Sequence, residues 1–119
     1  MGKRVLIVDN SVDLAESLGE LIGLDDSLEY VGYVTTGADA LEQARRRAAD
    51  VLVLDLGLSD MSGMEVLAQL QQEALPARVI LHTGHASDAL AEEATRRGAR
   101  GYVVKGSDVS VLLAALREA

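Results

Sequence analysis

The sequence predicts a doubly wound α/β domain of five strand–helix units, (βα)5, over residues 1–119. Two observations predict this class. Short, continuous apolar runs recur along the chain, which is typical of parallel strands that are buried on both faces. Segments with helical periodicity separate the runs, and right-handed crossovers between parallel strands then limit the topology to doubly wound arrangements.

Five short apolar runs are the expected strands. They are Val5–Val8, Leu28–Val34, Val51–Leu54, Val79–Leu81 and Tyr102–Val104. The only proline, Pro76, lies just before the fourth run, where a loop is expected.

Helical periodicity appears between these runs. After the first run, apolar residues repeat at helical spacing, at Leu14, Leu18, Leu21 and Ile22. The third and fifth helices show the same period, at Val66, Leu67 and Leu70 and at Val109, Leu112, Leu113 and Leu116.

Residues that commonly cap helices mark the helix boundaries. The expected N-terminal caps are Thr36 with Asp39, Ser87, and Ser107 or Asp108. The glycines expected at helix C-termini are Gly23 and Gly98. With the Thr36–Asp39 pair as its start, the second helix is expected over residues 40–48.

The composition excludes several classes of function. A net charge of -8 disfavours direct binding of nucleic acid or of an anionic membrane by this domain. With three tyrosines and no Phe or Trp, an aromatic-lined pocket for a flat cofactor is not expected. The absence of cysteine excludes a disulfide framework and a thiol nucleophile. No apolar run has the length of a signal peptide core or a membrane span, so a cytoplasmic protein is expected.

Four of the five apolar runs end in polar residues that could form a site, whereas the second run is followed by Thr35 and Thr36, which offer no charge. The residues at the other four runs are Asp9 with Asn10, Asp55, Thr83 with Gly84, and Lys105. In an open parallel sheet, ligands bind outside the carboxyl ends of the strands, so these side chains are expected at one edge. Each residue by itself has an ordinary explanation as a cap, a strand residue or a surface lysine. Their occurrence together, each at the end of its own run, favours a functional site.

This set of residues suits phosphoryl chemistry. Two close carboxylates repel each other and are stabilised by a hard dication with oxygen ligands, most naturally Mg2+. Mg2+ readily takes phosphoryl oxygens, and a carboxylate beside it can attack phosphorus to give an aspartyl phosphate. Lys105 and Thr83 would hold the remaining phosphoryl oxygens.

In their order and spacing, Asp9, Asp55, Thr83 and Lys105 resemble the receiver domain of bacterial two-component response regulators, and the similarity covers residues 3–118. The resemblance implies a flavodoxin-like parallel five-stranded sheet with strand order 2-1-3-4-5. It implies that Asp55 is the phospho-acceptor and that Asp9 helps to bind Mg2+. Thr83 is then the hydroxyl that follows the phosphoryl group, and Lys105 is the ammonium that pairs with it.

The same resemblance suggests roles for further positions. Gly57 would supply a backbone carbonyl to the metal, and Tyr102 is the aromatic residue that turns inward on activation. Gly84 either leaves the site open to a phosphoryl donor or is a simple turn glycine. His85 either tunes the loss of the phosphoryl group or is a solvated loop histidine. The stretch GARGYVVKGS, residues 98–107, is similar to regulators with a LuxR-type helix-turn-helix output.

Three departures from the family pattern accompany the resemblance. Asn10 stands where a second acid is usual; its amide oxygen can ligate Mg2+ but brings no charge, so weaker metal binding is expected. Ser59 and Ser62 replace a usual proline and a usual acid in the loop after the phospho-acceptor. Gly106 stands where many relatives have proline.

The resemblance implies a signalling switch and not an enzyme. A sensor histidine kinase or phosphotransfer protein would phosphorylate Asp55, and the altered surface of the fourth helix, fifth strand and fifth helix would control an output domain or partner. The sequence does not determine whether the chain forms a homodimer. Asn10 motivates one alternative, an atypical receiver that binds partners independently of phosphate. A small phosphatase is another, disfavoured because Gly57 stands where its general acid would be. A flavin-binding domain is a third, disfavoured by the scarcity of aromatic residues.

Overall fold

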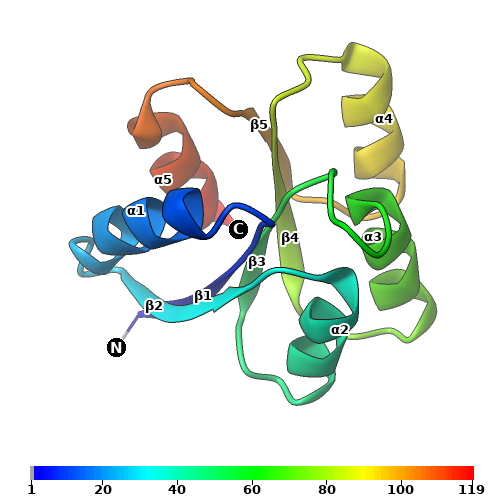
Figure 1. Cartoon of the computed structure of the whole chain (residues 1–119), viewed down its shortest axis with the longest axis horizontal. Helices are drawn as coiled ribbons and strands as arrows, with labels where there is room; N and C mark the ends of the chain where they lie inside the picture. Colours follow the sequence, from blue (N-terminus) through cyan, green and yellow to red (C-terminus); the bar gives the residue numbers. More distant parts are fainter. Residues whose placement is uncertain (1) are drawn as a thin grey trace.

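The computed structural model describes residues 2–119 and contains one parallel sheet of five strands in the order β2-β1-β3-β4-β5 (Figure 1). The strands are β1 Lys3–Val8, β2 Leu28–Val34, β3 Val51–Leu54, β4 Arg78–Thr83 and β5 Gly101–Val104. The helices are α1 Val12–Gly23, α2 Gly37–Arg45, α3 Gly63–Gln72, α4 Asp88–Arg96 and α5 Val109–Glu118. The expected doubly wound (βα)5 sheet and its strand order are confirmed. Within residues 2–119, none of the helices is both long and apolar enough to span a membrane.

Helices cover both faces of the sheet. Helices α1 and α5 lie on one face, and α2, α3 and α4 lie on the other (Figure 1). Successive residues of a strand therefore enter two different cores: in β3, Val51 and Val53 pack with α1 and α5, whereas Leu52 and Leu54 pack with the other three helices. All four side chains are buried. This two-sided burial explains why the three central strands, β1, β3 and β4, appear in the sequence as continuous apolar runs.

A polar side chain caps the N-terminus of each of the five helices within residues 2–119. The caps are Ser11, Thr36, Ser62, Ser87 and Asp108, and each accepts a hydrogen bond from a backbone N–H in the first helical turn. The predicted caps Thr36 and Ser87 are confirmed. Of the two candidates for α5, Asp108 is the cap.

The predicted bounds of the second helix were wrong, since α2 begins at Gly37 and not at residue 40, and it ends at Arg45 and not at residue 48. The helix stops there because Arg47 adopts a left-handed conformation with φ 56°. The Arg47 N–H then donates to the Ala44 carbonyl, and the next N–H donates to the carbonyl of Gln43, both at 3.1 Å. These two bonds satisfy the last carbonyls of the helix, as a C-terminal glycine commonly does.

The two predicted C-terminal glycines differ in outcome. Gly98, after α4, has φ 96°, which a side chain would disfavour, and its predicted role is confirmed. Gly23 is instead the last helical residue of α1, and Leu24 follows it in a right-handed conformation as the cap. Because this helix end needs no left-handed residue, the prediction for Gly23 was wrong.

Candidate functional site

Four predicted site residues lie at one edge of the sheet, where the strands end. Asp9 follows β1, Asp55 follows β3 and Lys105 follows β5, while Thr83 is the last residue of β4. The four strands are parallel and paired along their length, so these positions meet at the same edge. The expected convergence is present in the structure.

Lys105 joins the two acids directly. Its Nζ lies 2.9 Å from Oδ2 of Asp9 and 3.2 Å from Oδ2 of Asp55. Asp9 is 2% exposed and Asp55 is 7% exposed, so both carboxylates are buried. Burial alone would lower the pKa of Lys105, but its hydrogen bonds and charge interactions with both carboxylates outweigh burial and raise it. Two buried negative charges therefore share one ammonium, and one negative charge is left over.

Backbone groups orient both carboxylates toward the lysine. The Ser11 N–H donates to Oδ1 of Asp9 at 2.8 Å, and the Gly57 N–H donates to Oδ1 of Asp55 at 3.3 Å. Each carboxylate therefore has one oxygen held by the loop that follows it, while its Oδ2 contacts Lys105. This arrangement fixes the acids before any ligand is bound.

Two residues fix the position of the loop after Asp55, and neither of them was assigned a role from the sequence. Gly63, the first residue of α3, is so close to the Asp55 backbone that a Cβ there would collide with the Asp55 carbonyl oxygen. Asp60 accepts hydrogen bonds from the N–H groups of Gly37 at 2.8 Å and Ala38 at 3.0 Å. These bonds lower the pKa of Asp60 and fasten the loop to the start of α2.

Thr83 links the site to the loop between β4 and α4. Its side chain is buried, and Oγ1 accepts a hydrogen bond from the His85 N–H at 3.3 Å. The Thr83 carbonyl accepts from the Lys105 N–H at 2.7 Å. Gly84 and His85 are exposed. The Tyr102 hydroxyl, in turn, donates to the His85 carbonyl at 2.6 Å. A change at Thr83 can therefore reach Tyr102 through this one loop.

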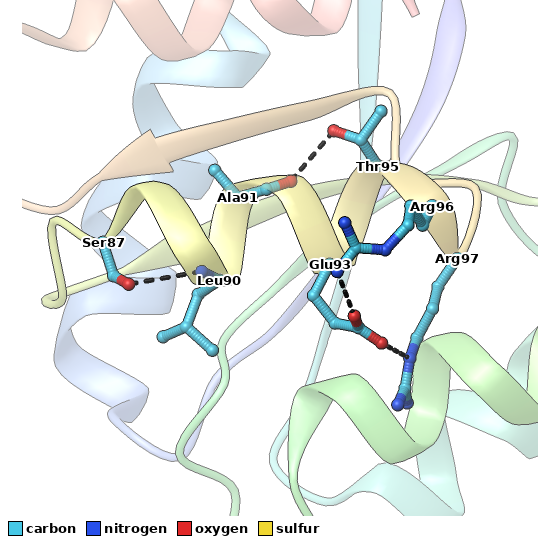
Figure 2. A network of polar contacts seen from close by, with 7 residues as sticks. All are labelled: Ser87, Leu90, Ala91, Glu93, Thr95, Arg96 and Arg97. Carbon is cyan, nitrogen blue, oxygen red and sulfur yellow. Dashed lines mark hydrogen bonds and ion pairs between the residues drawn. The ribbon is translucent and has the colours of Figure 1, made fainter.

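Helix α4 follows this loop, and the polar contacts drawn in Figure 2 lie within the helix and its caps. Only one of its nine residues, Ala94, is buried. Ser87 caps its start by accepting from the Leu90 N–H at 3.2 Å, and Glu93 pairs with two arginines in the last turn. A helix with so little buried surface is a good candidate for movement.

His82, in β4, is a further buried polar residue near this edge. Burial, and then the charge of Lys105, lowers the pKa of His82, against the opposing effect of Asp9 and Asp55. The imidazole is therefore favoured in its neutral form. His85, in contrast, is exposed.

The donor set of the site suits a hard dication. Asp9 and Asp55 supply buried carboxylate oxygens with an uncompensated negative charge, and the exposed Asn10 and Gly57 follow them in the chain. Such all-oxygen donors fit Mg2+. Within residues 2–119, no group of three or more His, Cys, Asp or Glu side chains is placed to hold a metal ion. The residues thus fit Mg2+ with two acids, supplemented by neutral oxygens.

Comparisons with known proteins agree with this geometry. Residues 5–117 match the family described as response regulator receiver domain. The nitrate/nitrite response regulator protein NarP of Escherichia coli is 36% identical over 116 residues, which are 96% of this chain and 53% of NarP. The chain thus spans about half the length of this curated relative.

Solved structures show the same similarity. The response regulator domain of Thermotoga maritima CheB superposes with a TM-score of 0.91 at 28% identity, covering 100% of this chain and 96% of that chain. A LuxR-family two-component response regulator from Aurantimonas sp. SI85-9A1 gives 0.87 at 29% identity, covering 99% and 87%. The second structure agrees with the subclass predicted from residues 98–107.

Proposed function

Because the chain belongs to the response regulator receiver domain family, we propose that it is a phosphorylation-dependent switch that accepts a phosphoryl group on Asp55. The observation that carries this proposal is the bridge of Lys105 between two buried carboxylates, Asp9 and Asp55. A single receiver domain over residues 1–119 accounts for all of the elements. Signalling, and not turnover of a small substrate, is the function.

The transfer uses Asp55 as the nucleophile. Its carboxylate oxygen attacks the phosphorus of a phosphohistidine on a sensor histidine kinase or phosphotransfer protein. The new O–P bond forms as the P–N bond breaks, and the imidazole leaves with the electron pair of that bond and takes a proton from solvent. Lys105, already 3.2 Å from Oδ2 of Asp55, pairs with the phosphoryl oxygens and stabilises their charge.

The metal site is built from the residues around Asp55. Asp9, Asp55, the Asn10 amide oxygen and the Gly57 carbonyl would hold Mg2+. When bound, the ion neutralises the carboxylates and the incoming phosphoryl oxygens. Since Asn10 brings no charge, this site has one acid fewer than the usual family pattern, and we expect it to bind Mg2+ more weakly.

The switch runs through Thr83 and Tyr102. A phosphoryl group on Asp55 offers new acceptors to the Thr83 hydroxyl. Rotation of the Thr83 side chain toward these acceptors moves Oγ1 away from the His85 N–H, from which it accepts a hydrogen bond at 3.3 Å. Movement of that loop also disturbs the bond from Tyr102 to the His85 carbonyl. The result is a population shift at the surface formed by α4, β5 and α5. Gly84, which has no side chain, leaves access for the phosphoryl donor, and the exposed His85 tunes hydrolysis.

This surface controls an output domain or a protein partner. The chain spans about half of NarP, and one similar structure belongs to the LuxR family, so a helix-turn-helix output of that type is the proposed downstream element. Transcription regulation would then depend on that output, because this domain, with a net charge of -8, is not suited to bind DNA itself. A homodimer formed through the same surface is compatible with the proposal.

Asn10 favours a second candidate, a receiver that binds partners independently of phosphate. An NMR titration with Mg2+ and beryllofluoride, a mimic of the phosphoryl group, separates the two. The proposed switch predicts chemical-shift changes at Asp55, Thr83 and Tyr102 in the wild type and none in Asp55→Asn. Asn10→Asp should tighten Mg2+ binding, since it restores a charge. No response of the wild type at millimolar Mg2+ would favour the phosphate-independent module.

A further inference from the structure

A second cluster of charged residues lies where the strands begin, at the opposite end of the sheet from Asp55 (Figure 1). Arg4 lies in β1, Arg78 is the first residue of β4, and Arg47 lies between α2 and β3. Together with Asp50, these arginines line one cavity of about 260 Å³. Three arginines and one aspartate are the charged residues that line this cavity, so its lining is net positive although the whole chain carries -8.

Asp50 neutralises only one of the three arginines. Its carboxylate accepts a hydrogen bond from the Arg4 N–H at 2.8 Å and pairs with Arg4 Nη2 at 3.2 Å. The Asp50 backbone N–H also donates to the Arg4 carbonyl, and the Asp50 carbonyl accepts from the Arg78 N–H, both at 2.9 Å. The backbone thus fixes Arg4 and Arg78 on either side of Asp50.

Arg78 carries a buried donor without an acceptor. Within residues 2–119, its Nε is the one buried side-chain nitrogen or oxygen that makes no hydrogen bond. Buried donors are nearly always satisfied in folded proteins. Arg47, at φ 56°, likewise forms no ion pair with the described part of the chain. Within the described part of the chain, Arg47 and Arg78 therefore form no ion pair, whereas Arg4 pairs with Asp50.

We propose that this cavity binds a phosphate-class oxyanion, either free phosphate or the phosphoryl end of a small phosphorylated molecule. Guanidinium groups bind such oxyanions through paired N–H donors, and Arg47 and Arg78 both line the cavity in which the phosphate would lie. Asp50, held by Arg4, repels the anion and confines it to the side of the other two arginines. Because this site lies at the opposite edge from Asp55, it does not depend on phosphorylation of that residue.

The test is an NMR titration of the 119-residue chain in EDTA with sodium phosphate, glycerol 3-phosphate, or sodium chloride at equal ionic strength. We expect saturable shifts of the amides of residues 47–50 and 77–79 with both phosphates and not with chloride. Tighter binding of glycerol 3-phosphate would identify a phosphorylated molecule as the ligand, and equal binding would identify phosphate itself.

Two matched variants test the assignment without disturbing the core. Arg47→Asn removes one positive charge, and asparagine tolerates the left-handed conformation of this position. The variant should bind phosphate about tenfold more weakly, which is the effect of one charge-assisted hydrogen bond. Arg46→Asn removes the same charge one position earlier, from an exposed residue that pairs with Glu42 and does not line the cavity, and should leave affinity unchanged. Equal losses in both variants, or the same shifts with chloride, would overturn the proposal.

Discussion

Replacing Lys105 with methionine tests the electrostatics of the site. Methionine keeps the length of the side chain but removes the charge that lies 2.9 Å from Asp9 and 3.2 Å from Asp55. Two buried carboxylates then face each other without a cation. We predict that Lys105→Met is less stable than the wild type, and that adding Asp55→Asn to this variant restores much of the loss.

The geometry sets the size of both effects. Since both Oδ2 atoms contact one nitrogen at 2.9 and 3.2 Å, they lie at most about 6 Å apart. At an effective dielectric constant of about 20, their repulsion is about 3 kcal/mol. Removing one partner of a fully buried pair costs about 3–5 kcal/mol. Because the Lys105 side chain is 24% exposed and solvent screens part of the interaction, we expect a loss of about 2–3 kcal/mol and a similar recovery in the double variant.

Urea unfolding followed by circular dichroism at pH 7 in EDTA measures these free energies. The matched control is Asp55→Asn in the wild-type background, where relief of repulsion is offset by the lost contact with Lys105, so a much smaller change is expected. Adding Mg2+ should also stabilise Lys105→Met. Equal stability of Lys105→Met and the wild type, or further destabilisation on adding Asp55→Asn, would refute this reasoning.

Three further predictions concern an ion pair at the opposite edge of the sheet and two contacts beside the site. Hydrogen bonds from Ser27 and Arg117 lower the pKa of Asp25 to about 2. The stabilisation from this carboxylate is therefore present above about pH 4 and is lost as the pH falls toward 2. Carbon-detected NMR should show the pKa of Asp25 rising in Arg117→Ala, and an unchanged pKa would count against the ion pair. Gly63→Ala should lower the free energy of unfolding by about 1–3 kcal/mol through its collision with the Asp55 carbonyl, and unchanged urea unfolding would contradict that contact. Tyr102→Phe should speed amide exchange in residues 84–87 and cost about 1 kcal/mol, and exchange equal to that of the wild type would show that the hydroxyl does not hold the loop.

The sequence predicts that four candidate site residues lie at one edge, because parallel strands place their ends together. Asp9, Asp55, Thr83 and Lys105 each follow or end an apolar run, and the runs are unusually clear because both faces of the sheet are covered. The apolar pattern of the sequence does not determine which strands are neighbours in the sheet. The order 2-1-3-4-5 is implied only by the family resemblance. Nor does the pattern show that Lys105 contacts both acids at once, since this depends on side-chain geometry.

Long-range and backbone effects explain what the sequence did not predict. Asp60 accepts hydrogen bonds from the first N–H groups of α2, which lie more than twenty positions earlier in the chain. No local sequence pattern links Asp60 to these residues. The early end of α2 depends on an arginine, Arg47, in a conformation that usually favours glycine. Gly63 resembles any glycine at a helix start until the Asp55 backbone is placed beside it.

The most direct test of the central claim is phosphorylation by acetyl phosphate, followed by mass spectrometry of the intact chain and of its peptides. We predict the mass gain of one phosphoryl group on Asp55, dependent on Mg2+ and absent in Asp55→Asn. A phosphoryl group found on another residue, or labelling that persists in Asp55→Asn, would contradict it.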